Sequence, residues 1–203
     1  MSSETQKVAP GMSSVLNFPN QVTSLRLILS VVLFGFMTWH YYLTSLGLFI
    51  VAAGTDWLDG YYARKYGQVT TLGRILDPFA DKVIICGTFI FLTAVPVMAQ
   101  VPYGLRAWMV VVIVGRELLV TALRSFIEER GGDFSAKMSG KLKMVLQCVA
   151  AGTCLYYLSY AHPLDDAPRW LWALMVTSLW SAVALTIYSG VGYIRAAIEL
   201  LRV

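Results

Sequence analysis

The chain has 203 residues, of which 57% are hydrophobic and only 14% are charged, and its formal net charge is +4. A mean hydropathy of +0.63 does not suit a surface that faces water, so the composition excludes an ordinary soluble domain and indicates a membrane protein. The basic residues show no aromatic-interleaved pattern, so nucleic acid is not expected as a partner, whereas anionic lipid is.

The first segment, residues 1–21, is polar and is interrupted by Pro10, Gly11 and Pro19. It shows neither the short apolar core nor the small-residue cleavage site of a secretory signal. We therefore expect a cytoplasmic or interfacial N-terminal segment over residues 1–21, followed by a single membrane domain over residues 22–203.

A membrane-spanning helix needs roughly 20 predominantly apolar residues. Six stretches meet this requirement, at about 22–39, 42–63, 78–98, 105–127, 139–161 and 169–194. The sequence therefore predicts an all-α, polytopic membrane protein with six transmembrane helices. The residues from Pro96 to Gly104 include two prolines and are expected to stop helix formation between the third and fourth spans.

Positive charge gathers on one side of this predicted bundle. The loops and helix ends of the opposite side hold only Arg106 and Arg169, whereas the first side holds Lys7, Arg64, Lys65, Arg74, Arg124, Arg130, Lys137, Lys141, Lys143, Arg195 and Arg202. By the positive-inside rule the first side is cytoplasmic. Both termini are therefore expected in the cytoplasm, with the protein integral to the inner (cytoplasmic) membrane.

Four aspartates lie around the second and third predicted spans. Asp56 and Asp59 are three residues apart near the end of the second span, and Asp77 and Asp81 are four apart at the start of the third. Residues at these spacings share a helix face, and Pro78 at a first helical position would make Asp77 an N-cap. Because one span enters the cytoplasm and the next leaves it, all four carboxylates are expected at one membrane depth.

Four like charges in a poorly hydrated pocket need protons or cations, and hard oxygen ligands select magnesium, manganese or calcium. A site for one or two metal ions is therefore predicted. The alternative is that the aspartates are helix caps and interfacial charges, balanced by Arg64, Lys65, Arg74 and Lys82. Acids within a membrane are costly and usually functional, which favours the metal site.

The pattern Asp56-x-x-Asp59-Gly60-x-x-Ala63-Arg64, then eight residues, then Gly73-x-x-x-Asp77-x-x-x-Asp81, resembles the signature of the CDP-alcohol phosphotransferases. The resemblance implies two ions, Mg²⁺ or Mn²⁺, one held by Asp56, Asp59 and Asp77 and the other by Asp56, Asp77 and Asp81. It implies that Gly60, Ala63, Arg64 and Gly73 bind the cytidine diphosphate part of CDP-diacylglycerol. It also implies a homodimer.

Such a site would transfer the phosphatidyl group of CDP-diacylglycerol to an alcohol by in-line displacement, with CMP as the leaving group and the active site facing the cytoplasm. We predict that Asp81 acts as the general base toward the acceptor hydroxyl.

A group of basic residues on the fourth and fifth predicted spans is expected to hold a phosphate of the acceptor. It consists of Arg116, Arg124, Lys137, Lys141 and Lys143. The alternative is structural: Arg116 would pair with Glu117, and the lysines would only follow the positive-inside rule. Aromatic residues of the last span, Tyr193 among them, are expected to serve as membrane anchors and in packing.

Residues 17–26, 76–82, 115–124 and 139–147 resemble the corresponding segments of the family's bacterial phosphatidylglycerophosphate synthases. This implies sn-glycerol 3-phosphate as the acceptor and phosphatidylglycerol phosphate and CMP as products. Two alternatives stay open at this point. One is the same chemistry with inositol phosphate or phosphatidylglycerol as acceptor, and the other is an ion transporter that uses the acidic cluster.

Overall fold

The computed structural model describes residues 18–66, 71–129, 138–161 and 167–201, and within these ranges every regular element is a helix. The helices are α1 (Phe18–Thr38), α2 (Tyr42–Tyr66), α3 (Thr71–Ala94), α4 (Pro96–Gln100), α5 (Ala107–Glu129), α6 (Met138–Ala161) and α7 (Arg169–Leu201). The prediction of an all-helical fold is confirmed for this part of the chain.

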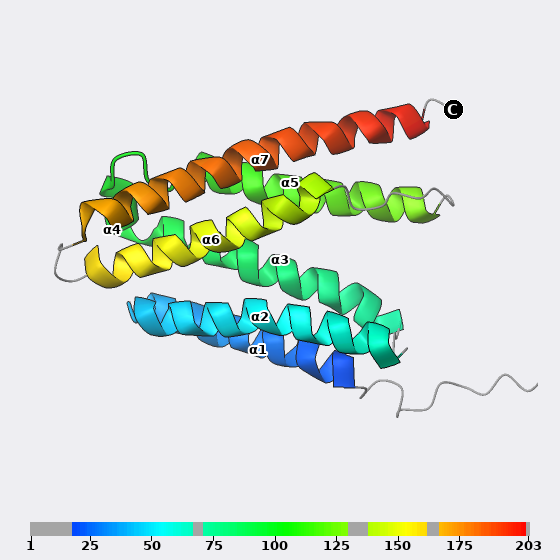
Figure 1. Ribbon diagram of the computed structural model, residues 1–203, viewed down its shortest axis with the longest axis horizontal. Coiled ribbons are helices and arrows are strands. Elements are labelled where there is room, and N and C mark those ends of the chain that lie inside the picture. The colour runs from blue at the N-terminus through cyan, green and yellow to red at the C-terminus, as the bar shows by residue number, and fades with distance from the viewer. Residues whose placement is uncertain (1–17, 67–70, 130–137, 162–166, 202–203) are drawn as a thin grey trace, which may run out of the picture.

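The long helices run side by side along the longest axis of the molecule, and each reverses the direction of the one before it (Figure 1). The ends of α2, α5 and α7 therefore lie at the same end of the bundle as the starts of α1, α3 and α6. We call this end, where α2 ends at Tyr66 and α3 begins at Thr71, the aspartate end.

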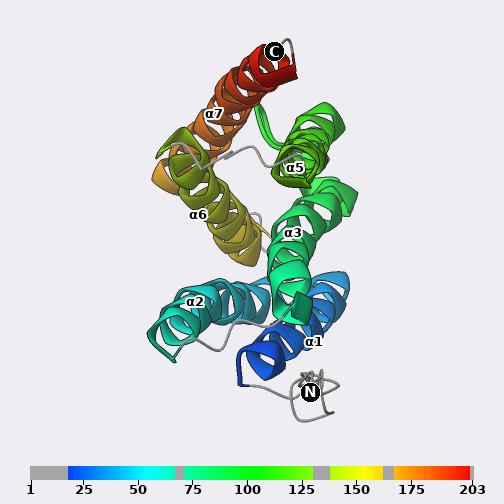
Figure 2. The same ribbon diagram turned by 90° about the vertical axis from the view of Figure 1, so that its right-hand side faces the viewer.

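Two groups of helices pack together to form the bundle. Figure 2 looks at the aspartate end and shows α1 and α2 on one side, α5 and α7 on the other, and α3 between α1 and α5. The helix α6 packs against α7, α2 and α3, so α3 and α6 join the two groups.

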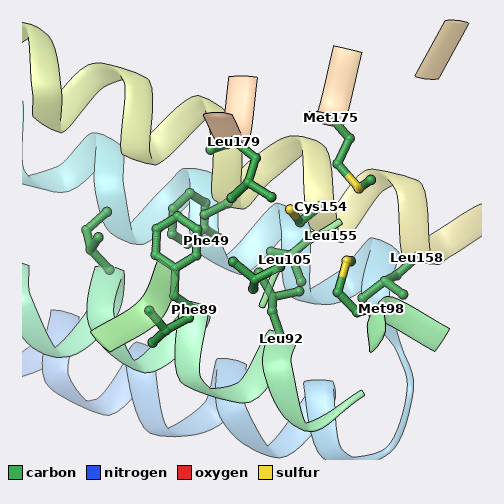
Figure 3. Close-up of a cluster of buried hydrophobic side chains, with 14 of the residues drawn as sticks. Phe49, Phe89, Leu92, Met98, Leu105, Cys154, Leu155, Leu158, Met175 and Leu179 are labelled. Carbon is green, nitrogen blue, oxygen red and sulfur yellow. The ribbon is translucent and has the colours of Figure 1, made fainter. Parts of the chain in front are cut away.

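The core is apolar and lies where these helices meet (Figure 3). Phe49 of α2, Phe89 of α3, Met98 of α4 and Leu155 of α6 are among the side chains that are 2% exposed or less. Many large apolar residues instead point outward, such as Ile28, Val31, Ile50, Val111 and Tyr188, each at least 60% exposed. An apolar outer surface is expected where lipid is the solvent.

Three helices are long and apolar enough to cross a membrane among the residues that the structure describes, with spans at Gln21–Thr38, Leu142–Ala161 and Arg169–Arg195. They correspond to the first, fifth and sixth predicted spans. A shorter apolar stretch, Tyr42–Thr55, occupies the first half of α2. The helix α5 carries Arg116, Glu117 and Arg124, and these charges reduce its apolar character.

Two local predictions were wrong. The segment after the third span does not stop helix formation throughout, because Pro96–Gln100 forms α4 with a proline in its first turn, where the missing N–H costs no helical hydrogen bond. Pro78 does not begin a helix either, since α3 starts at Thr71 and encloses it, so Asp77 is not an N-cap. Membrane helices tolerate such interior prolines when neighbouring groups satisfy the backbone.

The contact between α1 and α3 depends on Gly87. A Cβ atom at this position would overlap Cζ of Phe34 on α1. The Phe34 ring cannot move aside freely, because it is stacked on Phe91 with 4.7 Å between ring centroids and 7° between the planes. The absence of a side chain at Gly87 therefore lets these two helices approach each other.

We expect Gly87→Ala to destabilise the protein by about 1–3 kcal/mol, the usual cost of an overpacked core. The measurement is thermal unfolding of the purified protein in detergent. The double variant Gly87→Ala/Phe34→Leu should recover part of the loss, and Gly35→Ala on α1, where an added Cβ meets no atom within 4 Å, is the matched control. A Gly87→Ala variant as stable as the wild type would contradict this account of the interface.

Candidate functional site

The predicted metal ligands come from the end of α2 and the beginning of α3. Positions 56 and 59 belong to α2 and positions 77 and 81 to α3, and the two helices contact each other. Because α2 ends and α3 begins at the aspartate end (Figure 1), all four positions belong to the halves of these helices nearest that end. The side chains at 56, 59 and 77 lie outside the described residues, as do those at 63 and 64 and the surroundings of Gly60 and Gly73.

No group of three potential metal-ligating side chains occurs among the described residues, which include only Asp81 of the four aspartates. Asp81 is accessible, with 28% of its side chain exposed. The ligand set of the predicted metal site therefore stays a prediction.

Asp81 is held by an arginine from another helix. Nη1 of Arg26 on α1 donates a hydrogen bond to Oδ1 of Asp81 over 2.8 Å, and the side chain of Arg26 is fully buried. The alternative interpretation of the aspartates, as interfacial charges, named Lys82 as one of the balancing basic residues. Nζ of Lys82 donates its hydrogen bond to the carbonyl oxygen of Pro78. The sequence feature that could have identified this partner is Arg26 itself, the one charged residue in the first predicted span, since a charge within a membrane needs a partner.

Glu117 joins two members of the predicted acceptor group. Nζ of Lys143 on α6 donates to Oε1 of Glu117 on α5, and Nη1 of Arg116 lies 3.6 Å from the same oxygen. The side chains of Lys143, Arg116 and Glu117 are 4%, 9% and 14% exposed. The pairing that was considered as a structural alternative is therefore present, and it brings Arg116 and Lys143 together.

The last helix contributes two residues to this group. The ring of Tyr193 on α7 lies under the guanidinium of Arg116, with 5.1 Å from Cζ to the ring centroid, and Tyr193 is only 3% exposed. An added Cβ at Gly190 would lie 3.2 Å from Cγ of Arg116, so glycine leaves room for the arginine. Tyr193 thus packs as expected, but it packs on a charge and is not an interfacial anchor.

Several nitrogens of the basic group are buried without a hydrogen-bond partner among the described residues: Nε and Nη2 of Arg116 and Nε of Arg124. Buried donors usually have partners, so these three suit an anionic ligand. The helices α5 and α6, which carry Arg124 and Lys143, both contact α3, the helix that carries Asp81. Position 141 belongs to α6 but its side chain is outside the described residues, and Lys137 lies wholly outside them.

Comparison with known proteins gives related sequences along almost the whole chain. The family model described as CDP-alcohol phosphatidyltransferase matches residues 16–188. The chain is 33% identical over 204 residues to the CDP-diacylglycerol–glycerol-3-phosphate 3-phosphatidyltransferase of Bacillus subtilis, covering 93% of this chain and 98% of that protein. It is 34% identical over 205 residues to a probable phosphatidylglycerophosphate synthase of Mycobacterium tuberculosis, covering 97% and 88%. It is 30% identical over 191 residues to the Escherichia coli CDP-diacylglycerol–glycerol-3-phosphate 3-phosphatidyltransferase, covering 89% and 94%.

We expect Glu117→Gln to destabilise the protein by about 3–5 kcal/mol, because the buried ammonium of Lys143 would lose its carboxylate. Thermal unfolding in detergent measures the effect. The matched control is Glu117→Gln/Lys143→Met, which removes both charges and should recover much of the stability. If the single and double variants unfold at the same temperature, the ion pair does not join α5 to α6 in the way described.

Proposed function

Because the chain belongs to the CDP-alcohol phosphatidyltransferase family, as its aspartate signature predicted, we propose that it transfers the phosphatidyl group of CDP-diacylglycerol to sn-glycerol 3-phosphate. The products are phosphatidylglycerol phosphate and CMP. The observation that carries the choice of acceptor is the buried basic group of α5 and α6, in which Arg116 has two nitrogens without a hydrogen-bond partner among the described residues. The names of the relatives in Bacillus subtilis and Escherichia coli support the same acceptor.

The chemistry of the donor set fits divalent metal ions. Carboxylate oxygens are the ligands that Mg²⁺ and Mn²⁺ prefer, and Asp81 is exposed enough to reach an ion. In the proposal, Asp56, Asp59 and Asp77 hold one ion and Asp56, Asp77 and Asp81 the second. Ions held by these residues would supply positive charge that stabilises the charge developing on the departing CMP.

In the proposal, side chains of the protein bind the donor, orient the acceptor and accept a proton. Gly60, Ala63, Arg64 and Gly73 hold the cytidine diphosphate group of the donor. Arg116, Arg124, Lys137, Lys141 and Lys143 orient the phosphate of the acceptor. A carboxylate oxygen of Asp81 accepts the proton of the acceptor hydroxyl as that hydroxyl attacks the donor phosphorus.

The proposed arrangement in the membrane follows from the direction of the helices. The helices α1, α2, α3, α5, α6 and α7 span the inner membrane as one domain over residues 22–203, with both termini and the aspartate end on the cytoplasmic side. The basic residues expected on the other side are Arg106, directly before α5, and Arg169, the first residue of α7, and both helices begin at the end of the bundle opposite the aspartates (Figure 1). The acyl chains of the donor stay in lipid, so the site opens sideways to the bilayer. We propose that the protein acts as a homodimer.

The rival functions differ in what they release. A family member with another acceptor, such as inositol phosphate or phosphatidylglycerol, would still form CMP. An ion transporter that uses the acidic cluster would not, and membership of a transferase family weighs against it.

The decisive experiment is CMP release by the purified protein in detergent with CDP-diacylglycerol and Mg²⁺. Glycerol 3-phosphate should support release, while inositol phosphate, serine and phosphatidylglycerol should not. Release with one of these other acceptors would contradict the assignment of the basic group, and no release with any acceptor would contradict the enzymatic function itself.

The basic group is tested by the single variants Arg124→Gln and Lys141→Gln. Loss of one charge-assisted hydrogen bond to a phosphate costs about 1.5–3 kcal/mol, so each variant should raise the KM for glycerol 3-phosphate roughly 10- to 100-fold. The KM for CDP-diacylglycerol should change much less. Arg195→Gln is the matched control, because Arg195 is an exposed cation near the end of α7. An equal rise of both KM values would contradict an acceptor-specific pocket.

A further inference from the structure

We propose that Arg26 is a positioning residue of the catalytic centre, which acts by holding the carboxylate of Asp81. This inference rests on the proposed function, because Asp81 has a catalytic role only within it. The observation is the ion pair between the two side chains, with 2.8 Å between Nη1 of Arg26 and Oδ1 of Asp81.

The sequence of α1 places Arg26 on the face that packs inside the bundle. Thr23, Arg26, Ser30, Leu33 and Met37 are all buried, and their spacings of three or four residues form one continuous stripe along the helix. The helix α1 packs against α2 and α3. Arg26 is thus the charged member of an otherwise uncharged buried stripe, directed at the helix that carries Asp81.

The two partners differ in exposure, and this difference separates their roles. The side chain of Arg26 is 0% exposed, whereas that of Asp81 is 28% exposed. Arg26 is therefore enclosed by protein and is not available to substrate, while Asp81 lies at the boundary where a substrate or an ion can reach it. Any contribution of Arg26 to the reaction must therefore act through the protein groups around it, among them the Asp81 carboxylate that it binds.

A charge-assisted hydrogen bond of this length restricts the rotation of the carboxylate that accepts it. With Oδ1 held by α1, the orientation of the carboxyl plane of Asp81 is set before substrate arrives, which is the preorganisation that proton transfer requires. The guanidinium also adds one positive charge beside Asp81, which in the proposed site would lower the repulsion between Asp81 and the other three aspartates. Arg26 therefore has two separable effects, one through geometry and one through charge.

A purely structural role would be different. If the ion pair only ties α1 to α3, loss of Arg26 should lower the unfolding temperature without a specific change in turnover or in metal affinity. The test must therefore include readouts that a tie between helices does not affect. It must also include a variant that keeps the charge of Arg26 but changes its geometry.

The experiment compares Arg26→Gln and Arg26→Lys, purified in detergent. The first readout is CMP release with CDP-diacylglycerol, glycerol 3-phosphate and Mg²⁺, separated into kcat and KM. The second is Mn²⁺ binding, followed by the electron paramagnetic resonance signal of the free ion, which requires no turnover. The matched control is Arg106→Gln, because Arg106 donates to the carbonyl oxygens of Ala99 and Val101 at the opposite end of the bundle.

Arg26→Gln should lower kcat at least tenfold, with both KM values within threefold of the wild type. It should also bind Mn²⁺ at least tenfold more tightly, because a positive charge next to the metal site is removed. Arg26→Lys keeps the charge but not the planar fork, so it should bind Mn²⁺ like the wild type while kcat falls by a smaller factor. Arg106→Gln should change neither quantity.

Two results would overturn the proposal: wild-type kcat in Arg26→Gln, or Mn²⁺ affinities in Arg26→Gln and Arg106→Gln that do not differ. If Arg26→Gln is not recovered as folded protein, Arg26→Lys with wild-type kcat overturns it equally. These results can be told apart from failure of the proposed function, because in that case the wild-type protein itself would release no CMP. A tighter binding of Mn²⁺ by Arg26→Gln would in that case still support the link between Arg26 and the aspartate site.

Discussion

The antiparallel connection of α2 to α3 is the constraint on which the proposed chemistry depends. Because α2 ends at Tyr66 and α3 begins at Thr71, two aspartates from each helix belong to the same end of the bundle (Figure 1). Four carboxylates near a membrane require positive charge close by. The arginine of α1 that pairs with Asp81 supplies one such charge, and the proposed metal ions supply the rest.

Polar side-chain pairs join the helices where apolar packing alone is unspecific. In lipid, contacts between apolar surfaces give little preference for one helix arrangement over another, so hydrogen bonds between helices carry more of the specificity. Arg26 and Asp81 join α1 to α3, Lys143 and Glu117 join α6 to α5, and Gln147 donates to Thr186 to join α6 to α7. The first two of these pairs belong to the proposed site, so in the proposal the same contacts that order the bundle would also position the reacting groups.

The sequence predicts the long helices well, because apolar stretches of membrane length leave few other structures open to the backbone. It also identifies the family, through the fixed spacing of the aspartate signature along two helices. It does not predict which residues meet across helices, since spacing specifies a face but not its neighbour, and so the partners Arg26 of Asp81 and Tyr193 of Arg116 were missed. The helix α4 and the interior position of Pro78 were missed because a proline suits either the start of a helix or, with support from neighbours, its interior. The metal ligands and the membrane topology stay predictions.

The central claim is that the ends of α2 and α3 form a metal centre at which CDP-diacylglycerol reacts. The most direct measurement is a crystal structure of the protein with Mn²⁺ and CDP-diacylglycerol, in which anomalous scattering locates the metal. The account predicts two manganese peaks between α2 and α3, one of them next to Asp81 and both beside the pyrophosphate. Manganese bound elsewhere, or a nucleotide bound away from these helix ends, would contradict it.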